Sequence, residues 1–135
     1  MIESAEQFRS LRESGAPNEY HRAAHDEASL EVWLDVVSGM PTMRFWVAQN
    51  KTIPVEVLEV LAKDPDSQVR EMVARKRKLP ESLQFKLATD FDSSVRSALA
   101  CNRSLASLVR EKLTKDEDEL VREAARRHAS DGIRR

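Results

Sequence analysis

The chain repeats itself at a fixed interval of 26 residues, and this periodicity constrains its fold more than any other feature. Five residues of one frame recur 26 positions later and again after a further 26. The frames are Leu61, Asp64, Asp66, Val69 and Arg70; Leu87, Asp90, Asp92, Val95 and Arg96; and Leu113, Asp116, Asp118, Val121 and Arg122. Chance seldom keeps five residue types in register twice, so the periodicity predicts a repeat protein.

The first half of each repeat has the pattern of a helix with one buried stripe. The segment from Pro54 to Lys63 carries apolar residues at the i, i+1, i+4, i+5 spacing of such a helix: Val57, Leu58, Leu61 and Ala62. Asp64-Pro65 should end this helix, because a residue that precedes proline is disfavoured in the α region.

The second half of each repeat predicts another short helix, antiparallel to the first. Asp66 stands where an N-cap is expected, shortly before the first apolar position. The apolar side of this helix is Val69, Met72 and Val73, and in the next repeat it is Val95, Ala98 and Leu99. At about 3.6 residues per turn the second helix has room for roughly three turns. The repeat length leaves open that one of the two helices is partly 3₁₀.

The run from Ile53 to Arg103, with its L-A-x-D-P-D-x-x-V-R-x-x-V-A pattern, resembles the leucine-rich repeat variant family, which is related in design to HEAT-like repeats. The resemblance extends over Met43 to His128, roughly two thirds of the chain. It implies an all-α fold, a right-handed α-solenoid of short two-helix repeats in a HEAT-like superhelix. The iron–sulfur cluster of one member cannot be carried over, because Cys101 is the only cysteine.

The chain is expected to form one α-solenoid domain over residues 1–135, with the repeats at 43–128. Residues 1–42 are interpreted as degenerate N-terminal capping helices, because repeat arrays end in atypical units. Their helical patterns run from Ile2 to Ser14, from Glu19 to about Glu27, and from Leu30 to Val37. The tail at 129–135 lacks apolar periodicity and is predicted to be disordered.

The repeat also extends backwards in degenerate form. Met43 and Arg44 occupy the columns of Val69 and Arg70, and Trp46 and Val47 follow in the core columns. In the third helical pattern, the residues expected to be buried are Val32 or Trp33 with Val36 and Val37.

Composition restricts the compartment. A single cysteine excludes an internal disulfide framework and suits a reducing environment. The first ten residues are acidic and amphipathic, unlike a secretory signal, and no apolar run approaches the roughly 20 residues of a membrane helix. The protein is therefore expected to be cytoplasmic and to have no membrane partner.

The repeated aspartates are the first candidates for chemistry, because paired carboxylates can act as acid and base or bind metal. They occur once per repeat beside an arginine, however, whereas a catalytic site is normally needed once. We interpret them as helix caps and as an Asp–Arg ladder that joins adjacent repeats. No catalytic residue, cofactor or metal is therefore expected, and the protein is predicted not to be an enzyme.

The histidines offer a second candidate. His21 and His25 are four residues apart and would share a helix face, the spacing of a metal-binding pair. No H-E-x-x-H arrangement and no third ligand accompany them, so a surface pair is the favoured interpretation. Cys101 would need a histidine or a cation nearby to act as a nucleophile, and the sequence does not locate one.

A basic run, Arg75, Lys76, Arg77 and Lys78, falls on one turn between repeats. Such a run can bind phosphates, which keeps a HEAT-like nucleic-acid-binding protein as an alternative. The chain has a net charge of −1, and the neighbouring turns do not repeat the cluster. Charge is also uneven: residues 1–42 hold 8 acidic and 3 basic residues, and the rest of the chain has a net charge of +4.

The favoured function is a non-enzymatic module that binds a protein partner through the concave face of the solenoid. That face should present the outward columns of the second helices: Thr42, Gln68 and Ser94; Phe45, Glu71 and Ser97; Gln49, Arg75 and Cys101. Phe45 is the one large apolar residue among them and is either an interface anchor or packed under the N-terminal helices. The sequence does not decide between a scaffold and a bacterial immunity protein that neutralises a cognate toxin.

Overall fold

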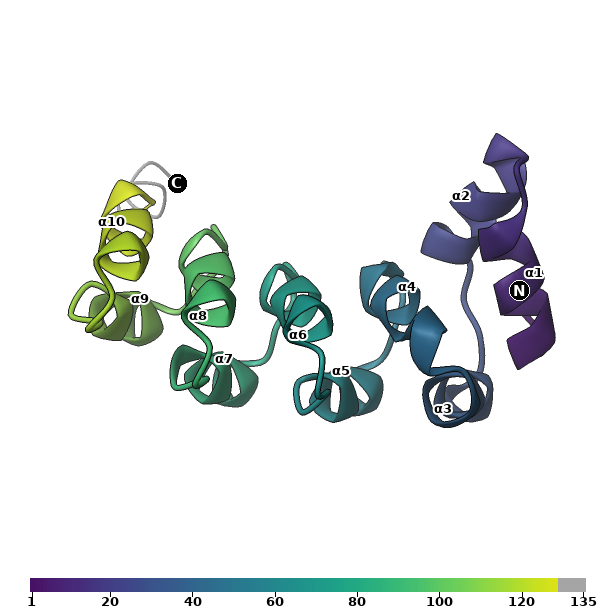
Figure 1. Ribbon diagram of the computed structural model, residues 1–135, viewed down its shortest axis with the longest axis horizontal. Coiled ribbons are helices and arrows are strands. Elements are labelled where there is room, and N and C mark those ends of the chain that lie inside the picture. Colours follow the sequence, from purple (N-terminus) through teal and green to yellow (C-terminus); the bar gives the residue numbers. More distant parts are fainter. Residues whose placement is uncertain (129–135) are drawn as a thin grey trace. The chain divides into compact units, whose positions relative to one another are not determined.

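The computed structural model describes residues 1–128, which fold as α-helices joined by short turns (Figure 1). The prediction of an all-α chain is confirmed. The only strand-like pairing in this range is a single parallel bridge between Ile2 and Ala28. None of the helices within residues 1–128 is long and apolar enough to cross a membrane. The predicted disordered tail at 129–135 lies outside the described residues.

The chain divides into two compact units, Met1–Leu61 and Ala62–Arg135. The N-terminal unit contains α1 (Ala5–Glu13), α2 (Pro17–His25), α3 (Leu30–Gly39), the 3₁₀ turn η1 (Pro41–Met43), α4 (Arg44–Gln49) and α5 (Val55–Leu61). The C-terminal unit contains α6 (Ser67–Ala74), α7 (Glu81–Ala88), α8 (Ser93–Ala100), α9 (Ser107–Leu113) and α10 (Glu119–Arg127). The three expected N-terminal helices are all present, with boundaries shifted by at most three residues.

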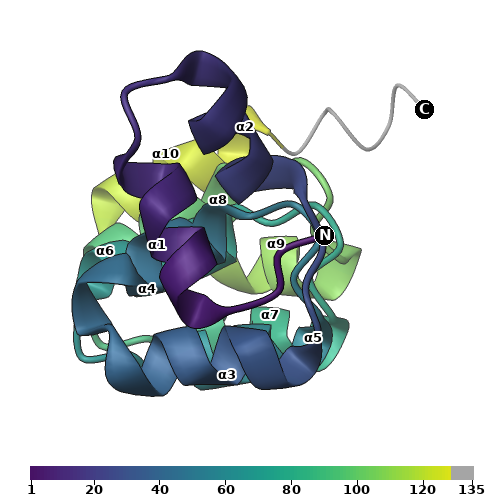
Figure 2. The ribbon, with the colours of Figure 1, turned by 90° about the vertical axis from the view of Figure 1, so that its right-hand side faces the viewer.

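Large aromatic side chains close the core of the N-terminal unit. Helix α1 packs against α2 and α3 (Figure 2), and the fully buried rings of Phe8 and Trp33 meet edge to face at 5.3 Å. Trp33 and not Val32 is the buried member of the predicted pair, together with Val36 and Val37. The guanidinium of Arg12 lies 3.5 Å from the ring centre of Trp46, a cation–π contact.

Helix α1 begins at Ala5, later than the predicted Ile2, for two reasons. The Ser4 hydroxyl accepts a hydrogen bond from the Gln7 backbone N–H at 3.0 Å and so caps the helix. The Ile2 N–H donates to the Glu27 carbonyl at 2.8 Å, which holds Ile2 in an extended segment beside Ala28.

Two layers of helices form the C-terminal unit. Helix α8 packs between α6 and α10, while α7 packs against α9 in a second row (Figure 1). The fully buried residues between the layers are aliphatic and come from the predicted columns, as Val73, Leu87, Val95, Leu99 and Leu113 illustrate. Met72 differs from the expectation, because it is only half-buried.

The second helix of each repeat is shorter than the roughly three turns predicted. Helices α6 and α8 have eight residues each, just over two turns. Each repeat must also supply two connections, and the backbone turns away at Arg75 and Cys101, the C-caps of α6 and α8. Within residues 1–128, the one 3₁₀ turn is η1, outside the regular repeats.

The repeated aspartates cap the second helices as predicted. Asp66, Asp92 and Asp118 each accept a hydrogen bond from the backbone N–H two residues later, at 2.8–2.9 Å. The first aspartate of each pair accepts from the backbone N–H of the second, as Asp90 does from Asp92 at 2.9 Å. Each repeat therefore fixes the start of its second helix with both carboxylates.

The predicted Asp–Arg ladder is present in the C-terminal unit. Arg70 donates through Nε to Asp90 at 2.9 Å and through Nη1 to the Asp64 carbonyl at 2.7 Å. Arg96 repeats the arrangement 26 residues later, with Asp116 at 2.9 Å and the Asp90 carbonyl at 2.6 Å. The paired side chains are only 5–9% exposed. Each arginine thus connects the turn of its own repeat with that of the next.

Candidate functional site

The exposed columns of the second helices lie on one face of the C-terminal unit, formed by α6, α8 and α10. Gln68, Arg75 and Cys101 are exposed there, and Glu71, Ser94 and Ser97 are half-buried. Phe45 and Gln49, the other two predicted binding residues, lie on α4 of the N-terminal unit. Phe45 is half-buried, and its ring meets that of Trp46 edge to face at 4.9 Å. Thr42, from the same set of outward columns, is exposed in η1.

One hollow on this face collects most of the predicted residues, and we call it the serine hollow. Its volume is about 370 Å³. Five of the predicted binding residues line it, together with four that were not predicted to bind: Glu71, Arg75, Ser94, Ser97 and Cys101, with Ser93, Ala98, Asp118 and Leu120. Three successive second helices therefore contribute to one concave site.

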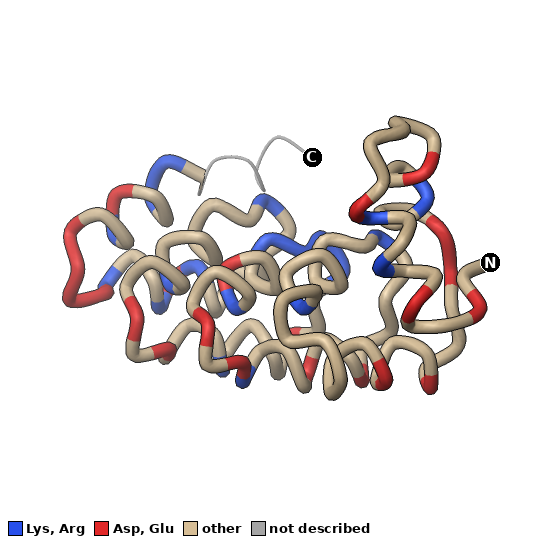
Figure 3. The backbone as a smooth tube through the Cα atoms, turned by 45° about the vertical axis from the view of Figure 1, so that its right-hand side comes forward, with Lys and Arg blue, Asp and Glu red and all other residues tan. Residues whose placement is uncertain are grey.

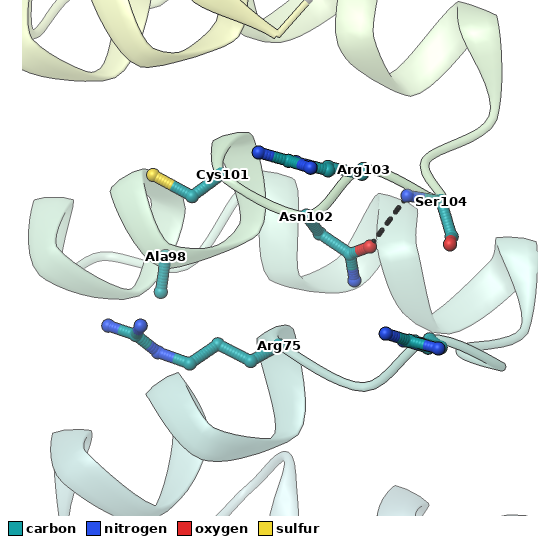
Figure 4. A pocket seen from close by; sticks show the side chains of 7 residues that line it. Arg75, Ala98, Cys101, Asn102, Arg103 and Ser104 are labelled. Atoms are coloured by element: carbon teal, nitrogen blue, oxygen red, sulfur yellow. Dashed lines mark hydrogen bonds between the residues drawn. The ribbon is translucent and has the colours of Figure 1, made fainter. Parts of the chain in front are cut away.

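A larger hollow of about 630 Å³ adjoins it, and we call this one the arginine hollow. Its lining is Arg75, Arg77, Ala98, Cys101, Asn102, Arg103 and Ser104. In Figure 4 the Arg75 side chain extends toward Ala98, the Cys101 thiol points to the same side, and Arg103 reaches back toward Cys101. Arg75, Ala98 and Cys101 belong to both hollows, so the two form one continuous depression.

The four members of the basic run have different surroundings in the structure. The run is the longest stretch of consecutive basic residues in the sequence, and Figure 3 colours basic positions blue. Arg75 and Arg77 are exposed and line the arginine hollow. Lys76 is half-buried, and its carbonyl accepts a hydrogen bond from the Asn102 amide at 2.8 Å. Lys78 is exposed but lines neither hollow. The run is therefore not a single four-residue patch.

Asn102 fixes the floor of the arginine hollow. Its buried side-chain amide donates to the carbonyls of Ala74 and Lys76 at 2.9 and 2.8 Å. Its Oδ1 accepts from the Ser104 N–H at 2.9 Å, the dashed line in Figure 4. Two successive turns are thereby held to each other. Asn50 makes the equivalent bonds in the N-terminal unit, to the carbonyls of Ala23 and Asp26.

The edge of the serine hollow includes the N-terminal end of α8, where the charge of Asp92 is stabilised. A hydrogen bond from the Ser94 hydroxyl at 2.7 Å lowers the pKa of the Asp92 carboxyl, and the Ser94 backbone N–H at 2.9 Å adds to the effect. The positive charges of Arg70 and Arg96 lower it further. Asp92 is thus held as an acceptor for a helix cap, a state that disfavours a role as proton donor.

The other candidate groups do not form a catalytic constellation in the described part of the chain. The rings of His21 and His25 stack with their centres 4.0 Å apart, on the exposed side of α2. Among residues 1–128 no group of three or more histidine, cysteine, aspartate or glutamate side chains could hold a metal ion. Cys101 has cationic side chains in the same hollow, which the sequence alone did not locate.

The 26-residue offset could have identified several of the residues that were missed. Leu120 occupies the column of Gln68 and Ser94, and it is 69% exposed. Arg103 occupies the column of Arg77. The role of Asn102 could not be identified in this way, because its amide bonds reach carbonyls 26 and 28 residues earlier in the chain. Local sequence patterns carry no signal for contacts at such separations.

No protein-family model, characterised protein or solved structure matches this chain. The repeat therefore stands on its internal periodicity and on the helix packing within the C-terminal unit.

Proposed function

We propose that the 26-residue repeats form an α-solenoid of the HEAT-like or leucine-rich repeat variant type, a right-handed superhelix. The support is the regular packing in the C-terminal unit, where α6, α8 and α10 form one row and α7 and α9 the other. Arg70 and Arg96 make the same two bonds one repeat apart, which is typical of stacked equivalent units.

The proposed function is binding of a protein partner by the face that α6, α8 and α10 present. One observation carries it: five residues placed outward by the periodicity line a continuous depression on that face. The depression holds arginine, serine, glutamate and an exposed leucine, a mixture of polar and apolar groups that suits recognition of a polypeptide. The repeated aspartates are engaged as caps and ladder acceptors, which favours a binding role over catalysis.

A bacterial immunity protein that neutralises a toxin in the cytoplasm is a narrower form of this proposal, and a scaffold is another. The acidic N-terminal region, with a net charge of −5 over residues 1–42, would complement a basic toxin surface. A toxin gene next to the gene for this chain would favour the immunity protein over the scaffold.

Nucleic-acid binding is the second candidate, because three arginines line one hollow. Binding to phosphates would weaken steeply with salt, by about one unit of slope for each contact. The carboxylates of Glu71 and Asp118 in the adjoining hollow oppose a polyanion. The protein-binding function is therefore preferred.

The test begins with affinity capture of a partner from the native organism, followed by binding measurements with the purified partner. Arg75→Glu, on the α6–α8–α10 face, should weaken binding at least tenfold, which is about 1.4 kcal/mol. Arg75 is exposed, so this change should not disturb the fold. Phe45→Ala is a separate test of whether α4 of the N-terminal unit, where Phe45 is half-buried, also contributes to binding. Charge reversal at Lys112, exposed on α9 in the other row, should change little. A partner that responded to Lys112 and not to the α6–α8–α10 face would contradict the proposal.

A further inference from the structure

The arginine hollow combines a concentration of positive charge with a fixed frame. Its three guanidinium groups come from two successive repeats: Arg75 and Arg77 follow α6, and Arg103 follows α8. No carboxylate is among the described residues that line it. The hollow is therefore a cationic site built by the packing of two turns, and not by one run of sequence.

Two of these guanidinium groups are available to a ligand. Arg75 and Arg77 are exposed, and within residues 1–128 neither side chain makes a hydrogen bond or an ion pair. This contrasts with Arg70 and Arg96, whose donors are engaged by Asp90 and Asp116. Arginine thus has a structural role in the column of Arg70 and Arg96, whereas Arg75 and Arg77 keep their donors available to a ligand.

The hollow is also preorganised. The Asn102 amide joins the turn that carries Arg77 to the turn that carries Arg103, through bonds to the Ala74 and Lys76 carbonyls. A ligand would not have to order these turns, so less conformational entropy is lost on binding. Helices α6 and α8 end at the hollow, and each C-terminus carries roughly half a negative charge. The guanidinium groups of Arg75 and Arg77 together exceed that, which leaves their part of the hollow positive.

We propose that the arginine hollow binds the carboxylates of an acidic, extended segment of a protein partner. The planar guanidinium fork matches a carboxylate with two parallel hydrogen bonds. The adjoining serine hollow then offers hydroxyls and the 69% exposed Leu120 to the next residues of the segment. This inference rests on the proposed protein-binding function and names the partner's chemistry.

An acidic peptide fits better than a nucleic-acid backbone. Duplex DNA carries a charge about every 1.7 Å along its axis. Such a strand would have to pass the carboxylates of Glu71 and Asp118 once it left the arginine hollow. A peptide can place acidic side chains over the arginines and neutral ones over the serine hollow, so it avoids this repulsion.

Cys101 provides a reporter inside the site, because it is the only cysteine of the chain and lines both hollows. The rate of its modification by the neutral reagent dithiodipyridine is measured in the full chain, with increasing amounts of end-blocked hexaglutamate or hexaglutamine. Hexaglutamate should slow the modification, and hexaglutamine should not. Equal effects of the two peptides would overturn the proposal.

Matched variants distinguish binding at the arginine hollow from a general effect of the protein's positive charge. Arg75→Gln with Arg77→Gln should raise the concentration of hexaglutamate needed for half-protection at least tenfold. Lys86→Gln with Lys112→Gln removes the same charge from exposed positions on α7 and α9, and should leave protection within twofold of the parent chain. Arg75→Lys with Arg77→Lys keeps the charge but loses the fork, and should fall between the two. Equal losses in the two glutamine pairs would overturn the proposal.

A hexathymidylate oligonucleotide distinguishes the other polyanion. Protection by this oligonucleotide at a tenfold lower concentration than hexaglutamate would overturn the acidic-peptide proposal and favour nucleic acid. The proposed function has its own readout: a captured partner that is sensitive to Gln68→Arg, exposed on α6 outside both hollows, but indifferent to the Arg75 and Arg77 glutamine pair would refute the arginine-hollow inference alone.

Discussion

The interiors of the two units are stabilised by different kinds of contact. The N-terminal unit buries the rings of Phe8 and Trp33 and stacks Arg12 on Trp46. The C-terminal unit has two aromatic residues, Phe85 and Phe91, and both are exposed, at 37% and 88%. Its interior consists of aliphatic side chains, with the Arg–Asp ladder linking successive turns.

The difference shows what repetition demands of a core. A repeating unit must present the same shape to each neighbour, and Arg96 reproduces the bonds of Arg70 after 26 residues. A region without repetition can instead fill one irregular space with one large ring. The polar link common to both units is a buried asparagine, Asn50 in one and Asn102 in the other.

The largest expected effect tests the aromatic core. Trp33→Ala should lower the free energy of unfolding by about 4 kcal/mol, because it removes a fully buried ring and leaves a cavity. Chemical denaturation monitored by circular dichroism measures the loss. Trp33→Phe is the control: it keeps most of the volume and removes an Nε1 group that has no hydrogen-bond partner among residues 1–128, so its cost should be much smaller. A loss below 1 kcal/mol for Trp33→Ala would show that the ring does not organise this unit.

The next effect tests the ladder. Arg96→Ala should cost about 3 kcal/mol, because it leaves the nearly buried carboxylate of Asp116 without its cationic partner. The double variant Arg96→Ala with Asp116→Asn should recover part of this loss, since no buried charge then remains unpaired. Both are measured by chemical denaturation.

Arg122 supplies the matched comparison for the ladder. Like Arg70 and Arg96, it donates to the carbonyl of the first aspartate of its own repeat, here Asp116 at 2.7 Å. Unlike them, it forms no ion pair with a carboxylate within residues 1–128. Arg122→Ala should therefore cost clearly less than Arg96→Ala. Equal losses would mean that the carbonyl bond, and not the carboxylate pair, stabilises the turn.

A third effect tests the buried asparagine that each unit contains. Asn102→Ala and Asn50→Ala should each cost about 2 kcal/mol, because each removes a buried amide that donates to two backbone carbonyls. Thermal and chemical denaturation of both variants would show the match. Asn18→Ala, at an exposed position of α2, should be nearly neutral. A large difference between the two buried sites would break the parallel between the units.

The smallest effect concerns pH. The pKa of Asp92 is lower in the folded chain than its ordinary value, chiefly because of the Ser94 hydroxyl. A depressed folded pKa means that the resulting stability is present above the ordinary value and is lost as the pH falls through the folded value. Ser94→Ala should raise the pKa of Asp92 toward its ordinary value, and NMR titration of the carboxyl measures it. An unchanged pKa would assign the shift to the arginines and the backbone alone.

Much of the local structure could be predicted from the periodicity. Asp66 caps its helix, Val73 and Leu99 are buried, and Arg70 and Arg96 are paired with aspartates, all as the columns indicated. The length of the second helices was predicted wrongly, because the pattern does not say how many residues the turns need. Met72 was placed in the core but is half-buried.

The candidate site was predictable only in part. Glu71, Arg75, Ser94, Ser97 and Cys101 were named from the outward columns, and these five line the depression. Arg77 was named only as part of the basic run, and Leu120 and Arg103 were missed, although the 26-residue offset points to both. Whether Phe45 is covered depended on how α4 packs; its ring is half-buried and contacts that of Trp46 edge to face.

The sequence by itself determined the repeat, the caps, the aliphatic columns and the absence of internal disulfides, because each follows from residue types at fixed spacings. The tertiary structure decided which polar groups meet. The guanidinium group of Arg70 donates to Asp90, 20 residues later in the chain. The amide of Asn102 donates to carbonyls 26 and 28 residues earlier. The gathering of Arg75, Arg77 and Arg103 in one hollow has the same origin. Hydrogen bonds and hollows depend on distances between turns, and those distances exist only after the helices have packed.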